Sequence, residues 1–155
     1  MGSRPKEVEI SFGLWMTSVL ISLISSVIFV SQFDTFRSMV LEEASRQMQG
    51  QDRVLDESQL DAIVTAGFVL ALAIILIIML LQLVFAFLMR KGRNWARIVL
   101  AVIGGILVLF GLSSLVGVPG GQLFLTLVSM IIVLGAIVTM FLPGANPWFR
   151  PPLRS

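Results

Sequence analysis

A long stretch without ionisable side chains limits what this chain can fold into. No Asp, Glu, Lys or Arg occurs between Arg97 and Arg150. Only 13% of all residues are charged and 57% are hydrophobic, whereas soluble domains carry about 25% charged residues. Apolar runs of about 18 residues or more favour helices that cross a bilayer. The sequence therefore predicts an integral membrane protein.

Four apolar runs have the length of membrane-spanning helices. The charge-free stretch is too long for one crossing, and Pro119, Gly120 and Gly121 divide it, since proline and glycine favour a turn. Pro143 ends the last run because proline cannot continue a helix. We expect an all-α, polytopic membrane protein, with four transmembrane helices in an antiparallel bundle and a single membrane domain over 1–155. The predicted helices are residues 10–33, 62–89, 94–116 and 122–142.

The first run could also be a signal peptide, because Arg4 and Lys6 precede it. Its extent from Ile10 to Phe33 far exceeds a signal core of about 7–15 residues, and no small-residue cleavage site follows. We therefore expect the first helix to be retained.

An acidic, amphipathic arm is predicted at 34–61, between the first two spans. It holds seven acidic and three basic residues, and Glu42 stands four residues before Arg46, a favourable helical pair. Apolar residues recur every four positions, so we expect the first helix to continue as a helical arm through about Gln49, with Gly50 as a stop. Its candidate extracytoplasmic docking residues are Phe36, Val40, Glu42, Glu43 and Met48.

The second span has two candidate start signals. Asp56 with Gln59, or Ser58 with Asp61, has the spacing of a helix cap, in which a side-chain oxygen bonds a free backbone N–H of the first turn. The acidic residues in that turn also oppose the positive end of the helix dipole.

Basic residues predict the orientation, because Lys and Arg near span ends stay in the cytoplasm. Eight of them fall on the side of the two predicted tails, 1–9 and 143–155, and three fall in the arm. Trp15, Trp95 and Trp148 are expected near the same interface. We expect a multi-pass protein of the plasma membrane with both termini in the cytoplasm.

A basic hairpin between the second and third spans is the most informative cluster. Its functional interpretation is a contact site for an anionic lipid headgroup or an acidic partner. In the simpler interpretation, its cations set the orientation of the chain and its tryptophan anchors it at the membrane interface. The candidate residues are Arg90, Lys91, Arg93, Trp95 and Arg97.

Small and polar residues inside the spans indicate close helix packing. Small side chains let helix backbones approach, and a buried amide in hydrocarbon requires a partner on another helix. The face they form packs either within this bundle or against another subunit. The candidates are Ser18, Ser22, Ser26, Gln82, Gly104 and Gly111.

Several chemistries have little support in the sequence. The chain has no His, Cys or Tyr, and no charge lies within the four predicted spans, where ion-coupled transporters need one. The spacing of the acidic arm does not match an EF-hand. We predict no catalytic residue, no metal, no cofactor and no nucleic-acid partner.

Three stretches at the predicted cytoplasmic interface, 4–8, 92–100 and 142–149, resemble a group of small, uncharacterised four-helix membrane proteins of actinobacteria. The resemblance implies a bacterial origin and a four-helix topology. It implies no activity and no catalytic residue.

The predicted function is that of a non-catalytic accessory or scaffold subunit that sits in the lipid bilayer and binds another membrane protein or an anionic lipid. The alternative is a small channel or transporter that assembles as a homo-oligomer.

Overall fold

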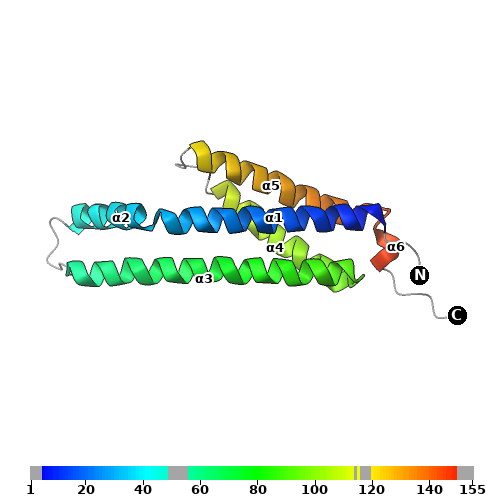
Figure 1. Ribbon diagram of the computed structural model, residues 1–155, viewed down its shortest axis with the longest axis horizontal. Coiled ribbons are helices and arrows are strands. Elements are labelled where there is room, and N and C mark those ends of the chain that lie inside the picture. The colour runs from blue at the N-terminus through cyan, green and yellow to red at the C-terminus, as the bar shows by residue number, and fades with distance from the viewer. Residues whose placement is uncertain (1–4, 49–55, 114, 116–119, 150–155) are drawn as a thin grey trace. The chain divides into compact units, whose positions relative to one another are not determined.

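The computed structural model describes residues 5–48, 56–113, 115 and 120–149, and this part of the chain is helical and contains no strand. The all-α prediction is therefore confirmed. In chain order the helices are α1 (Lys6–Ser31), α2 (Phe33–Met48), α3 (Glu57–Arg90), α4 (Asn94–Ser113), α5 (Gly120–Phe141) and α6 (Asn146–Phe149) (Figure 1).

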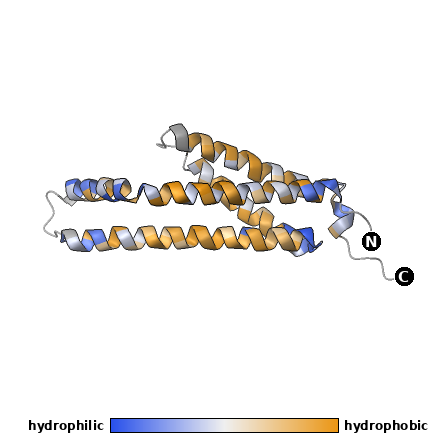
Figure 2. Cartoon of the chain, in the orientation of Figure 1, coloured by the Kyte–Doolittle hydropathy of each residue, from blue (hydrophilic) through white to orange (hydrophobic). Residues whose placement is uncertain are grey.

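Four of these helices are long and apolar enough to cross a membrane, as the sequence predicts. Figure 2 shows the hydrophobic colour running along α1, α3, α4 and α5, whereas α2 is mixed. The shortest candidate span has 19 residues, which corresponds to roughly 28 Å and matches a hydrocarbon core of about 30 Å. Within the described residues the candidate spans are Lys6–Ser31, Ser58–Arg90, Asn94–Ser113 and Leu123–Phe141.

The helices do not begin and end where the apolar runs do. α1 begins at Lys6 and α3 begins at Glu57, both earlier than the predicted spans, because a helix continues into polar residues that the hydropathy pattern excludes. The predicted continuation of α1 into the arm is interrupted at Gln32. Its N–H donates to the carbonyls of both Ile28 and Phe29, each at 3.2 Å, and its own carbonyl accepts from Phe36 at 2.9 Å. The interruption is therefore a single tightened turn.

Asp56 immediately precedes α3 and so stands at the cap position of the first predicted start signal, although its carboxylate bonds a side chain. Its backbone carbonyl accepts from the N–H of Gln59 at 2.9 Å, and its carboxylate accepts from the hydroxyl of Ser58 at 2.8 Å. The predicted stop at Gly50 lies outside the described residues.

Gly92 ends α3. Its φ of +83° is in the region that favours glycine. The N–H of Gly92 donates to Met89 at 2.8 Å and that of Arg93 donates to Leu88 at 3.2 Å, the paired bonds of a Schellman motif. This turn connects α3 to α4 within three residues.

The chain divides into two compact units, residues 1–23 with 78–155, and residues 24–77. In the first unit, the core comes from α1, α3, α4, α5 and the α6 region. Trp15, expected at an interface, is instead fully buried there. The other buried apolar residues are Val8, Ala86, Met89, Ala96, Leu100, Val133, Ala136, Met140, Ala145 and Phe149.

Gly104 on α4 makes room for the Trp15 ring. A Cβ atom added at Gly104 would lie 2.8 Å from Ile137 Cδ1, 2.9 Å from Trp15 Cη2 and 3.0 Å from Val133 Cγ1. α4 and α5 pack directly against each other, and Gly104 lets α1 and α5 side chains meet at the α4 backbone. Close approach of this kind is what small residues allow in membrane helices.

Two buried polar side chains of this unit find partners on other helices. The hydroxyl of Ser11 donates to the carbonyl of Ala136 on α5 at 2.8 Å. The amide of Gln82 on α3 donates to the hydroxyl of Ser18 on α1 at 3.4 Å. Such bonds connect helices because an unpaired polar group in hydrocarbon is costly.

The contacts of Gly104 generate a prediction about stability. Gly104→Ala should lower the free energy of unfolding relative to Gly105→Ala by about 1–3 kcal/mol, the usual range for overpacking. A Cβ at Gly105 meets nothing within 4 Å, so that variant is the matched control on the same helix. Chemical unfolding in detergent measures both, and equal stabilities would contradict the packing described here.

Candidate functional site

Two surfaces carry the residues that the sequence singles out, and each lies within one compact unit. The first is the basic hairpin, residues 90–97, at the junction of α3 and α4. The second is the exposed face of α2.

The C-terminal segment after α5 packs on the basic hairpin. A Cβ added at Gly92 would lie 3.2 Å from the carbonyl oxygen of Trp148 and 3.3 Å from its Nε1. Phe149, in the same short helix α6, is buried. Part of the predicted tail 143–155 is therefore ordered against the hairpin, a contact that hydropathy alone does not indicate.

Arg90 is neutralised within the chain. Its Nε and Nη2 atoms donate to the two carboxylate oxygens of Glu9, each at 3.2 Å. Its guanidinium also lies 4.6 Å from the centroid of the Phe12 ring. A paired arginine has little charge left for another ligand, so Arg90 differs from the other cations of the hairpin.

Arg97 is held by aromatic rings. Its guanidinium lies 4.2 Å from the centroid of Phe141 and 5.1 Å from that of Phe149, and Nη1 donates to the side-chain oxygen of Asn146 at 3.0 Å. Its Nε is buried and has no hydrogen-bond partner in the described part of the chain. These contacts fix its direction and leave its charge unpaired among the described residues.

Lys91 and Arg93 are exposed. Within residues 5–48, 56–113, 115 and 120–149 neither side chain makes an ion pair or a hydrogen bond. Trp95 is 48% exposed, and the centroid of its ring lies 5.5 Å from that of Phe85 in a T-shaped arrangement. The hairpin thus presents three uncompensated cations and an aromatic ring.

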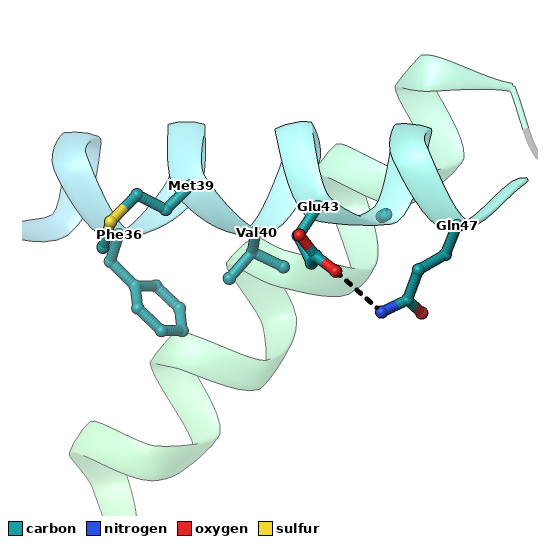
Figure 3. A pocket seen from close by; sticks show the side chains of 6 residues that line it. Phe36, Met39, Val40, Glu43 and Gln47 are labelled. Carbon is teal, nitrogen blue, oxygen red and sulfur yellow. Dashed lines mark hydrogen bonds between the residues drawn. The ribbon is translucent and has the colours of Figure 1, made fainter. Parts of the chain in front are cut away.

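The second surface is a groove on α2, shown in Figure 3. Its volume is about 350 Å³ and its walls come from α2 alone. Met39 is the most exposed of its large apolar side chains at 59%, and Glu43 accepts a hydrogen bond from Gln47 at 2.9 Å. The lining residues are Phe36, Met39, Val40, Glu43, Ala44 and Gln47.

The groove contains some of the predicted docking residues and adds others. Glu42 lies outside it and pairs with Arg46 at 2.6 Å, the predicted helical pair. The side chain of Met48 lies outside the described residues. Met39, which the four-residue spacing missed, stands three residues after Phe36 and so shares its helix face.

A cluster of phenylalanines attaches α2 to α3 beside this groove. Phe68 on α3 is only 8% exposed, and the ring centroids of Phe29, Phe33 and Phe36 lie 4.6, 4.4 and 6.3 Å from its own. Arg37 also forms an ion pair with Asp61. The arm thus packs on α3 of its own chain.

The remaining predicted packing residues lie where helices meet or are partly covered. A Cβ at Gly111 would lie 2.9 Å from Met130 Sδ on α5. Ser22 is half-buried and Ser26 is buried, the latter in the second unit. The described residues contain no group of three or more His, Cys, Asp or Glu side chains able to hold a metal ion. One surface therefore presents cations, and the other presents apolar side chains beside a carboxylate.

No protein-family model, curated protein or solved structure matches this chain. The resemblance to actinobacterial membrane proteins therefore stays a prediction.

The phenylalanine cluster predicts what holds α2 in place. Phe68→Ala should destabilise the α2 contact by on the order of 3 kcal/mol, a typical loss for a buried phenylalanine, and should speed amide hydrogen exchange across α2. Val69→Ala is the matched control, because Val69 is 59% exposed. Exchange mass spectrometry in detergent reports both, and unchanged α2 protection in Phe68→Ala would show that the cluster does not hold α2.

Proposed function

We propose that this protein is a non-catalytic accessory subunit of the plasma membrane that binds another membrane protein through the groove on α2. The observation that carries the proposal is the exposed apolar lining of that groove, on a helix outside the four candidate spans. The absence of His and Cys from the chain supports a binding role, since the commonest general base and the thiol nucleophile are both missing.

The groove keeps its apolar surface after α2 has packed on its own chain. Phe36 is still 40% exposed and Met39 is 59% exposed, although Phe36 contacts Phe68. Exposed apolar surface rimmed by polar side chains is typical of an interaction site. The groove volume of about 350 Å³ is sufficient for one or two large apolar side chains of a partner helix.

The charge of the groove identifies the kind of partner. Glu43 bonds Gln47 and has no cationic partner among the described residues. A Lys or Arg on the partner would pair with this carboxylate. Anionic headgroups are disfavoured here, because the carboxylate of Glu43 has no cationic partner among the described residues and repels them. The occupant is therefore an apolar helical segment of another membrane protein that carries a Lys or Arg.

The same proposal includes a topology. The four candidate spans form an antiparallel bundle, α2 lies on the extracytoplasmic side and both termini are cytoplasmic. The support is the distribution of Lys and Arg, with eight on the side of the termini and three in the arm.

Cysteine labelling tests this orientation. The chain has no native cysteine, so single substitutions are unambiguous. Ser3→Cys and Ser155→Cys should be shielded from an impermeant thiol reagent in intact cells, and Gln51→Cys should react. These positions lie outside the described residues. After permeabilisation all three should react, and reaction of either terminus in sealed cells would overturn the orientation.

Site-specific photo-crosslinking tests the docking proposal. A photoreactive amino acid at Met39 should crosslink to one membrane protein, at an apolar segment that contains Lys or Arg. The same probe at Ser38, on the opposite, polar face of α2, is the matched control and should not. Glu43→Lys should reduce the crosslink at least several-fold, because it places two cations together.

Other crosslinking results contradict the proposal. Equal yields from Met39 and Ser38, or crosslinks to lipid alone, would each remove the groove as the docking site. The groove would also be removed if the chain with residues 36–56 replaced by a Gly/Ser linker still inserted and recovered the same partner in a pull-down, a measurement that needs no photoprobe. Crosslinks to a second copy of this chain alone would favour the alternative, an oligomeric channel or transporter.

A further inference from the structure

The basic hairpin is not used by the proposed docking function, and the structure divides its cations into two classes. Arg90 is neutralised by Glu9. Lys91, Arg93 and Arg97 have no carboxylate partner in the described part of the chain. Three like charges within seven residues repel one another, so an anion bound among them lowers the electrostatic free energy.

The position of the hairpin identifies the source of that anion. One candidate span, Ser58–Arg90, ends just before residues 91–93, and the next, Asn94–Ser113, begins just after them. Residues 91–93 must therefore lie where the hydrocarbon meets water. Trp95 is 48% exposed there, as an amphipathic ring at the headgroup layer would be. Lipid phosphates occupy the same depth. The hairpin lies at this depth in either orientation of the chain.

Arg97 supplies a positioned donor. The rings of Phe141 and Phe149 and the oxygen of Asn146 hold its guanidinium, so little side-chain freedom is lost when it binds. The planar guanidinium matches a phosphate with two parallel hydrogen bonds. Its Nε is buried, so the Nη1 and Nη2 atoms are the donors left for a phosphate.

We propose that Lys91, Arg93 and Arg97 form a binding site for the phosphate of an anionic phospholipid headgroup, and that Arg90 is not part of it. The site goes beyond the proposed docking function and belongs to the other compact unit, so either proposal can fail while the other stands.

The test is lipid retention measured by native mass spectrometry of the full chain in mild detergent. We expect phosphatidylglycerol to be retained in preference to phosphatidylcholine. Each cation near an anionic headgroup contributes about fivefold in affinity. The double variant Lys91→Gln/Arg93→Gln should therefore bind phosphatidylglycerol about thirtyfold more weakly, while its thermal stability is unchanged because neither side chain has a partner to lose in the described residues.

The matched control removes the neutralised pair. Glu9→Gln/Arg90→Gln leaves the net charge unchanged and should bind phosphatidylglycerol within about twofold of the wild type. Arg97→Lys keeps the charge and loses the planar fork, so it should weaken retention by about fivefold or more. Arg97→Gln is less informative, since it also removes packing between Phe141 and Phe149.

Each other outcome overturns the proposal. Equal retention of phosphatidylglycerol by wild type and the Lys91/Arg93 variant would remove the site. If the wild type retained phosphatidylcholine as well as phosphatidylglycerol, the hairpin would not select an anionic headgroup. Displacement of lipid by millimolar inorganic phosphate would identify free phosphate as the ligand, and displacement by an acidic peptide would identify a protein partner. If the Glu9/Arg90 control lost as much phosphatidylglycerol retention as the Lys91/Arg93 variant, Arg90 would not differ from the other cations of the hairpin.

Discussion

The hydrocarbon environment is the constraint on which the rest of this structure depends. Backbone polar groups have no water to bond inside a bilayer, so a span must satisfy them internally as a helix. The same constraint acts on side chains. Gln82 bonds Ser18 and Ser11 bonds the carbonyl of Ala136, and each bond crosses from one helix to another. The few polar side chains inside the spans therefore help to specify which helices pack together.

The charged side chains lie at the ends of the spans, where water is accessible. Some of them are paired with an opposite charge of the chain, and others have no such partner among the described residues. Arg90 is compensated by Glu9, which ties the start of α1 to the end of α3. Arg97 is held by aromatic rings and has no carboxylate partner among the described residues. Arg93 is exposed and equally unpaired there. A row of cations that looks uniform in the sequence thus has one member paired with a carboxylate and others without a carboxylate partner among the described residues.

The apolar face of the α2 arm is partly covered by its own chain and partly exposed. One part of its apolar face is covered by Phe68 on α3, and another part, including Met39, remains exposed in a groove beside Glu43. The packing explains why an arm outside the spans is helical, since a short polar helix gains little stability by itself. The uncovered part is not needed for that packing and stays exposed.

Sequence by itself determined the all-helical class, the number of candidate spans and the Glu42–Arg46 pair, because hydropathy and helical spacing are local properties. Only the tertiary structure decided that Trp15 is buried against Gly104 rather than at an interface, and that Phe68 covers the arm. It also decided which cations are neutralised. These contacts join residues far apart in the chain, and inside an apolar run every face has a similar hydropathy, so no periodic signal marks the side that a neighbouring helix will cover.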